Sequence, residues 1–248
     1  INTHHIISDS WTLGILGNEI ISYYSSIIKN EQLNIKDSCE FSYINHITSE
    51  QEYKNSDKYE KDKAYWNDKF STVPEVAFIP SSMKSDAEST SIKANRKAFS
   101  INSVLLNKLK AFCTSQKISL FNFFMAIYAI YLGRVSNLDD FCIGTPILNR
   151  TNYKEKHTAG MFINSLPLRI KINNNISFIE FASIIAQDSM QLLRHQKYGY
   201  QAIIENIRKR ESQTPSLYTM MLSYQVTKII DNQEETPHHS EWIFDYTM

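Results

Sequence analysis

The sequence predicts an α/β fold in which helices cover a mixed sheet. Stretches with apolar residues three or four positions apart are typical of amphipathic helices, and they alternate with short apolar or strictly alternating stretches typical of strands. The 248 residues suffice for one large domain or two moderate ones. A serine-rich stretch with two prolines, at 71–95, indicates a linker between two units.

The first unit is expected to begin with an amphipathic helix. Asp9 or Ser10 can cap its first turn, because a short side-chain oxygen accepts hydrogen bonds from the free amides there. The preceding Ile6 and Ile7 favour an extended chain. The helix should bury one apolar stripe, which consists of Leu13, Leu16, Ile20, Tyr24 and Ile27.

A second, strongly charged helix is predicted over residues 56–70, with Trp66 and Phe70 on one side. The pattern fails after Phe70, where the linker begins. The chain is therefore divided into a first unit at 1–70, the linker at 71–95 and a second unit at 96–248.

The second unit is expected to alternate strands with helices. A capping box from Ser177 to Glu180 marks one helix start, and residues 119–135 are apolar on nearly all sides, which predicts a deeply buried helix. A helix at 103–116 should turn Leu105 and Phe112 inward. The other predicted helices lie at 177–196 and 199–210, and the strands at 96–101, 140–147, 164–172, 216–226 and 241–248.

Composition excludes several classes of protein. Lysine plus arginine equals aspartate plus glutamate, 26 against 26, so no basic excess indicates nucleic acid or an anionic membrane. The three cysteines are far apart and form no CxxC pair, which disfavours a disulfide framework or a zinc site and favours a reducing, cytoplasmic setting. No signal peptide or membrane span is evident, and the ends of the sequence suggest a fragment of a longer polypeptide.

The stretch INTHHIISDSW, at residues 1–11, is the strongest candidate for chemistry. A metal site built from His4, His5 and Asp9 is disfavoured, because adjacent side chains on an extended chain point to opposite faces. Both histidines could instead be ordinary core or surface residues. In the catalytic interpretation one imidazole faces a cleft as a general base, since imidazole titrates near neutral pH. Spacing alone leaves the role of Asp9 open.

Further motifs, in a fixed order over almost the whole chain, resemble the condensation domains of nonribosomal peptide synthetases, within the chloramphenicol acetyltransferase-like superfamily. HHIISDSW is similar to the family's HHxxxDG motif, and CIGTPILNR and GMFINSLPLRI resemble IGTPxxxR and GxFxNTLxLR. RHQKYGYQAIIE and SLYTMMLSYQV resemble HQxxPFExLV and PLFxVMFSYQ. The stretch at 50–66 resembles, only loosely, the one that leads out of the family's first lobe.

The resemblance implies a chloramphenicol acetyltransferase-like two-lobed sandwich with a tunnel between its lobes. Residues 1–70 would be the C-terminal part of the first lobe, and 96–248 the second lobe, truncated before its last strands. The implied reaction joins a donor acyl or peptidyl thioester to the amine of an acceptor aminoacyl thioester. On this basis, the isolated chain is expected to lack useful turnover.

Both substrates would arrive on the phosphopantetheine arms of donor and acceptor peptidyl carrier domains. The resemblance implies a neighbouring adenylation domain on the same polypeptide, no cofactor bound directly and no metal. Nucleic acid and membranes are not expected as partners.

The resemblance also implies roles for single residues. His5, the second histidine of the motif, would face the tunnel and accept a proton from the attacking amine, or hold the amine and the tetrahedral intermediate. His4 would pack inward. Asp9 would be the structural aspartate, paired with an arginine earlier in the first lobe and therefore upstream of Ile1. Ser10 stands where the family has glycine, and serine should make the better helix cap.

Candidates for the tunnel wall are Asn164 and the stretch Ser223, Tyr224 and Gln225. Each could instead have an ordinary structural role: Asn164 could satisfy a loop, and Ser223 and Gln225 could lie on the wetter side of a strand. Four other histidines, at 157, 195, 238 and 239, are interpreted as surface or structural residues.

Two alternative functions stay open. An epimerisation domain resembles the same family and keeps the histidine motif, but the IGTPxxxR-like and NSLPLR matches favour condensation. Heterocyclisation is disfavoured, because that subfamily replaces the histidines with aspartate-containing motifs. A degenerate, non-catalytic module that binds carriers is suggested by Ser10.

Overall fold

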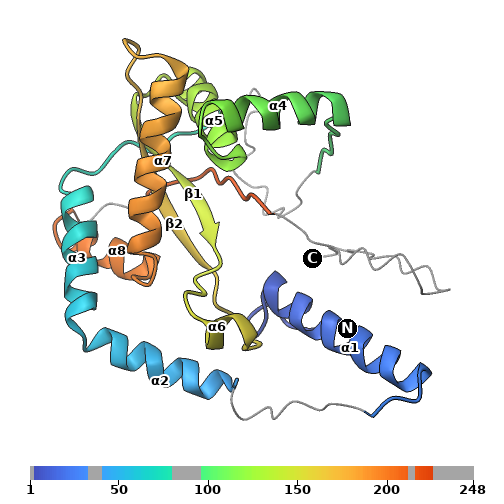
Figure 1. The fold of residues 1–248 in the computed structure, drawn as a ribbon. Coiled ribbons are helices and arrows are strands. Elements are labelled where there is room, and N and C mark those ends of the chain that lie inside the picture. Colours follow the sequence, from blue (N-terminus) through green and yellow to red (C-terminus); the bar gives the residue numbers. More distant parts are fainter. Residues whose placement is uncertain (1–2, 33–40, 80–95, 212–215, 226–248) are drawn as a thin grey trace, which may run out of the picture.

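The computed structural model of the chain describes residues 3–32, 41–79, 96–211 and 216–225. These residues form helices around a small sheet (Figure 1). The strands are β1 (Asp140–Ile147) and β2 (Asn164–Lys171), both predicted from the sequence. The helices are α1 (Ser10–Ile28), α2 (Tyr43–Lys54), α3 (Asp57–Lys69), α4 (Ser103–Ser115), α5 (Leu120–Ser136), α6 (Tyr153–His157), α7 (Phe178–Arg194) and α8 (Tyr200–Arg208).

Strand β1 is the centre of the sheet. It pairs with β2 in antiparallel register, with Gly144 opposite Pro167. Along the other edge of β1, single parallel bridges join Phe141 to Glu75 and Gly144 to Met221. The predicted mixture of parallel and antiparallel pairing is therefore present in the described residues.

Residues 216–225 run beside β1 without forming a regular strand. The Gly144 amide donates to the Met220 carbonyl and the Leu222 amide donates to the Gly144 carbonyl, both at 2.9 Å. The strand predicted here is thus an extended segment with one bridge. Met220 and Leu222 are partly buried, as their alternation predicts, but Tyr224 is 40% exposed.

The hydrophobic core lies between the sheet and its helices. α5 contacts β1, α7 contacts β2, and these two helices pack against each other. α3 packs against α8 and inserts Trp66 and Phe70 into the same core. The charged helix predicted before the linker therefore shares its core with residues of the second unit, and the division of the chain into two units stays a prediction.

Two helices of the second unit are less buried than the sequence predicts. α5 buries one side completely, but Ile127 and Tyr131 on its other side are 44% and 50% exposed. In α4 the expected inward residues Leu105 and Phe112 are 47% and 38% exposed, whereas Cys113 is buried. Apolar character around a helix does not reveal which side meets the sheet.

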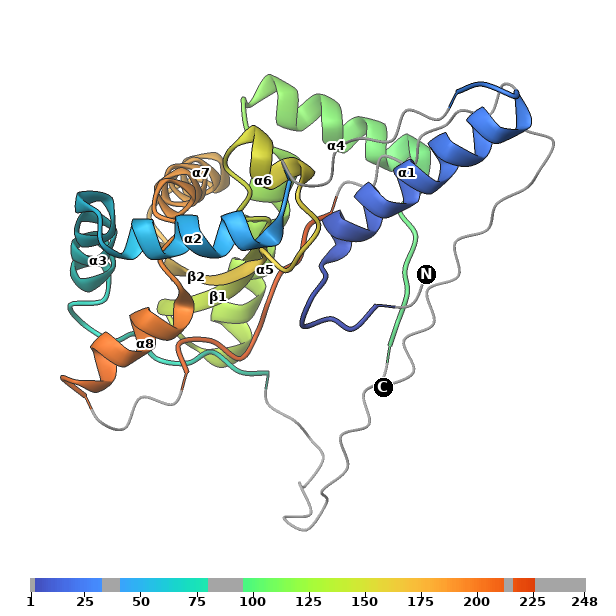
Figure 2. The same cartoon turned by 90° about the horizontal axis from the view of Figure 1, so that it is seen from below.

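α1 differs most from its expected environment. It begins as predicted, but much of the apolar stripe is not buried: Ile20, Tyr24 and Ile27 are each about half exposed, and only Leu13 and Leu16 are half-buried. Both views show why, because α1 reaches the body of the molecule only at its first turn and then extends away (Figures 1 and 2).

The helix starts follow the sequence closely. Asp9 caps α1 by accepting from the Thr12 amide, and Ser177 with Glu180 forms the predicted capping box of α7. α2 was not predicted. The strand predicted at 96–101 is wrong, because these residues are exposed and no strand is formed by them in the described part of the chain. The strand predicted at 241–248 lies outside the described residues.

Two further features concern the described residues alone. No single helix among them has both the length and the hydropathy required to cross a membrane, and α4 with α5 meets these criteria only as a pair bent by 99°. Cys113 and Cys142 are free and buried, and Cys39 lies outside the described residues.

The packing around β1 predicts that Gly144→Ala will destabilise the protein. A Cβ atom at Gly144 would lie 2.4 Å from the Tyr218 ring and 2.8 Å from Met221. Overpacking of this kind typically costs about 1–3 kcal/mol, which urea unfolding will detect. Gly14→Ala in α1 is the matched control: no atom lies within 4 Å of its Cβ position, so this variant should be no less stable than the parent. Equal stability of the two variants would contradict the described packing.

Candidate active site

The histidine pair lies on a tight turn just before α1. The Ile7 amide donates to the His4 carbonyl at 3.1 Å, and the Ile6 amide donates to His4 Nδ1 at 3.2 Å. The extended conformation predicted for this segment is therefore wrong, because local hydrogen bonds fold it back on itself. His4 and His5 are both exposed, so the expectation that His4 packs inward is also wrong for the described residues.

Exposure of His5 is compatible with its expected role, because a catalytic imidazole must be reachable by substrate. Its assignment stays a prediction. Ser8 stabilises the turn, because its buried hydroxyl donates to the His4 carbonyl at 3.1 Å and lies 2.9 Å from the Thr3 hydroxyl. No group of three or more potential metal ligands occurs among the described residues.

Asp9 lies two residues after the turn and fixes the start of α1. Its Oδ1 accepts from the Thr12 amide and lies 2.8 Å from the Thr12 hydroxyl, and its Oδ2 accepts from the Phe162 amide at 3.1 Å. Ser10, the next residue, is exposed and already helical, so Asp9 and not Ser10 is the cap. Ser10 has no positive φ, and the conformational freedom of glycine is not required at this position.

The partner of Asp9 is Arg150, from the stretch CIGTPILNR. Its Nη2 lies 3.1 Å from both carboxylate oxygens, and the two side chains are 1% and 0% exposed. The expectation that the arginine lies upstream of Ile1 is therefore wrong: the chain carries a partner 141 positions downstream of Asp9. The sequence contained this signal, since Arg150 ends a recognised motif, but spacing does not show which carboxylate an arginine meets.

Arg150 is held by more than Asp9. Its Nη1 donates to the carbonyls of Thr158, at 2.6 Å, and of Glu155, and its Nη2 donates to the Gly160 carbonyl at 3.0 Å. The guanidinium carbon lies 3.9 Å from the centre of the Phe162 ring. A buried ion pair is tolerated when additional hydrogen bonds satisfy both charges, and this one meets that condition except at Arg150 Nε.

The pair alters the titration of both groups. Burial alone raises the pKa of the Asp9 carboxyl, but hydrogen bonds from Thr12 and Phe162 and the charge of Arg150 outweigh it and hold the pKa below its ordinary value. Burial lowers the pKa of Arg150, and Asp9 opposes this effect. Asp9 is therefore ionised near neutral pH and cannot itself act as an acid there.

Three further contacts join α1 to α6 and to the loop that follows it. The Thr12 hydroxyl lies 2.7 Å from the Gly160 carbonyl and accepts from the Gly160 amide at 2.9 Å, and Trp11 Nε1 donates to the Lys156 carbonyl at 2.8 Å. The start of α1 and the region around α6 are accordingly adjacent in both views (Figures 1 and 2).

The expected tunnel residues make their described hydrogen bonds away from the histidine turn. Asn164 Nδ2 donates to the carbonyls of Gln196 and Tyr198, so its amide satisfies a loop. Ser223 and Gln225 are exposed and contact each other. Whether these residues touch substrate stays a prediction.

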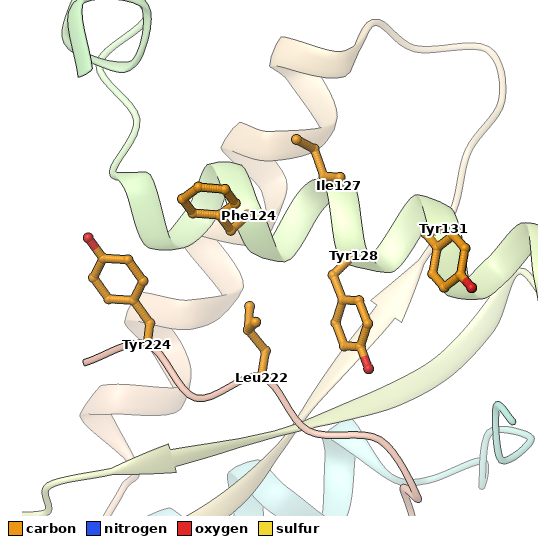
Figure 3. A pocket seen from close by; sticks show the side chains of 6 residues that line it. All are labelled: Phe124, Ile127, Tyr128, Tyr131, Leu222 and Tyr224. Atoms are coloured by element: carbon orange, nitrogen blue, oxygen red, sulfur yellow. The ribbon is translucent and has the colours of Figure 1, made fainter. Parts of the chain in front are cut away.

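Tyr224 lines an open apolar groove of about 480 Å³ between α5 and residues 216–225. Figure 3 shows the aromatic side chains of α5 along one wall and Leu222 with Tyr224 along the other. The lining is mostly apolar, and the hydroxyl groups of Tyr128, Tyr131 and Tyr224 are its polar groups.

The histidines interpreted above as surface or structural residues fit those roles where they are described. His195 Nδ1 lies 2.6 Å from the buried Asp62 carboxylate, and its ring stacks on Tyr65. His157 is exposed on α6. The pair at 238–239 lies outside the described residues.

Comparison with known proteins places these observations in context. The profile of the condensation-domain family matches residues 1–248. Surfactin synthase subunit 1 of Bacillus subtilis (strain 168) is 39% identical over 226 residues, which are 91% of this chain and 6% of that protein. Bacitracin synthase 3 of Bacillus licheniformis is 26% identical over 228 residues, 91% of this chain and 3% of that protein.

Solved structures show the same fold. The first condensation domain of the CDA synthetase superposes with a TM-score of 0.71 at 19% identity, covering 91% of this chain and 48% of that chain. VibH, a nonribosomal peptide synthetase condensation enzyme, gives 0.63 at 20% identity and covers 86% of this chain and 47% of that chain. The predicted chloramphenicol acetyltransferase-like α/β fold is confirmed. The chain spans about half of these domains and a small fraction of the two synthases.

The buried ion pair predicts a large loss of stability for Arg150→Met. Removing the guanidinium leaves the Asp9 carboxylate buried without its counter-charge, which typically costs about 3–5 kcal/mol. Denaturant unfolding measures the loss. Arg134→Met, at an exposed position at the end of α5, is the control and should change stability by less than about 0.5 kcal/mol. Similar unfolding of both variants would contradict the role of the pair.

Asp9 also predicts a specific pH dependence. The pKa of Asp9 is lower in the folded protein than its ordinary value of 3.8. Its contribution to the free energy of unfolding is therefore fully present above that pH and is lost as the pH falls through the lower folded pKa. The difference in unfolding free energy between the parent and Asp9→Asn should therefore be constant near neutrality and shrink below about pH 4. A difference that grows on acidification would contradict this assignment.

Proposed function

Because the chain belongs to the condensation-domain family, we propose that it forms an amide bond between a donor acyl or peptidyl thioester and the amine of an acceptor aminoacyl thioester. The observation that carries the proposal is the position of His5. It is exposed on a turn whose next residues, through Asp9, are fixed by a buried ion pair to Arg150. An exposed side chain on a fixed backbone can be presented to a substrate in one orientation.

The chemistry assigned to His5 needs a single proton acceptor. The acceptor's amine nitrogen attacks the donor's thioester carbonyl, and the tetrahedral intermediate then expels the donor's sulfur. The amine loses one proton and the departing thiolate gains one, so amide and free thiol are the products. His5 accepts the proton from the amine, or holds the amine and the intermediate while the proton moves.

The proposed substrates are carried on phosphopantetheine arms, so the proposed partners are donor and acceptor peptidyl carrier domains and an adenylation domain on the same polypeptide. The length of the related synthases supports this proposal, because this chain corresponds to only 6% and 3% of them. A cytoplasmic setting is also proposed, and the two buried free thiols, Cys113 and Cys142, support it.

His5→Ala in the full-length protein tests the proposal. Donor and acceptor aminoacyl carrier proteins are mixed with each variant, and dipeptide is followed by mass spectrometry. Loss of a general base typically costs about 10²–10⁴ in rate, and His5→Ala should fall in that range. His157→Ala, at an exposed histidine of α6, should keep the parental rate. Parental turnover by His5→Ala would exclude His5 as the proton acceptor, and a parent that forms no dipeptide would favour a carrier-binding module without chemistry.

A further inference from the structure

A second buried carboxylate lies directly behind Arg150. Glu155, on α6, closes the turn that starts at Thr151: its Oε2 accepts from the Thr151 amide and lies 3.0 Å from the Thr151 hydroxyl. The backbone carbonyl of the same residue accepts from Arg150 Nη1. Glu155 therefore shapes the loop whose carbonyls hold the guanidinium.

Lys197 supplies the charge that balances Glu155. Its Nζ donates to Glu155 Oε1 from the loop that follows α7, and the two side chains are 26% and 9% exposed. Burial raises the pKa of the Glu155 carboxyl, but the hydrogen bonds from Lys197 and Thr151 outweigh it, so the group is ionised near neutral pH. This ion pair is partly shielded from water and is stronger than an exposed one.

The loop that carries Lys197 is itself held in place. Asn164 Nδ2 donates to the carbonyls on either side of Lys197, those of Gln196 at 2.9 Å and Tyr198 at 3.2 Å. Two residues before Lys197, His195 lies 2.6 Å from the buried carboxylate of Asp62 on α3. Hydrogen bonds to β2 and α3 therefore hold the backbone on both sides of Lys197.

We propose that Lys197 and Glu155 are positioning residues for the histidine turn, and that they act through Arg150 and Asp9. The inference rests on the proposed function for its catalytic consequence. A continuous series of polar contacts runs from Lys197 to Glu155, from the Glu155 carbonyl to Arg150, and from Arg150 to Asp9. Asp9 lies two residues after Ile7, where the turn that carries His5 closes.

Loss of the contact between Lys197 and Glu155 should weaken the contact between Arg150 and Asp9. Without Lys197, the Glu155 carboxylate is left largely buried and uncompensated, a state that it can relieve only by moving towards water or taking up a proton. Either change loosens the turn that begins at Thr151 and shifts the carbonyls that hold Arg150. Asp9 then loses its fixed partner.

Hydrogen exchange measured by NMR on the intact protein tests this series without any assay of activity. The Thr12 and Phe162 amides donate to Asp9, so their exchange reports on the ion pair, and the Gly144 amide in the sheet reports on global opening. Lys197→Met should raise exchange at Thr12 and Phe162 at least about tenfold and leave Gly144 unchanged.

Three further variants make the test specific. Lys197→Arg keeps the charge and should restore parental exchange, and Glu155→Gln should reproduce the effect of Lys197→Met. Lys154→Met, at an exposed position on α6, is the matched control and should have no effect. Unchanged exchange at Thr12 and Phe162 in Lys197→Met, or an equal rise at Gly144, overturns the proposal.

Kinetics of dipeptide formation, assayed as for His5→Ala, test the catalytic consequence. Lys197→Met should lower kcat about tenfold or more with little change in KM, because a misplaced group is lost mainly from the transition state. Altered exchange with parental kcat would overturn the coupling to His5. If the parent itself forms no dipeptide, the proposed function fails, and the exchange measurement still decides whether Lys197 supports the turn.

Discussion

The buried ion pair between Asp9 and Arg150 is the interaction on which the rest of the candidate site depends. It joins two stretches 141 residues apart, and the contacts at the first turn of α1 surround it. Transfer of two charges from water to the interior is costly, so the pair is maintained by hydrogen bonds from Thr12 and to the loop at 158–160. These contacts fix the position of the backbone next to the histidine turn.

This dependence follows from how α1 is placed. Its apolar stripe is about half exposed in the described residues, so hydrophobic packing contributes little to holding the start of the helix against the body. Directional polar contacts take that role, and they define orientation more sharply than apolar contacts do. His5 can then be accessible to solvent while its backbone keeps a defined position. A turn held only by its own hydrogen bonds would not have a backbone fixed in this way.

Local patterns predicted local structure well, and contacts between distant segments poorly. The start of α1 at Asp9 or Ser10, the capping box of α7 and both strands of the sheet could be predicted, because each depends on residues a few positions apart. The burial of α1 and α5 could not, since the side of a helix that meets the core is fixed by tertiary packing. The partner of Asp9 was missed for the same reason.

We expect Arg150 to serve catalysis by holding the turn that carries His5. A double-mutant cycle on the rate of dipeptide formation by the full-length protein tests it most directly, with Arg150→Lys, which keeps the charge but loses the planar fork, and His5→Ala. Arg150→Lys should slow the reaction about tenfold or more when His5 is present and have no further effect when it is absent. Equal losses in both backgrounds would show that Arg150 does not act through His5.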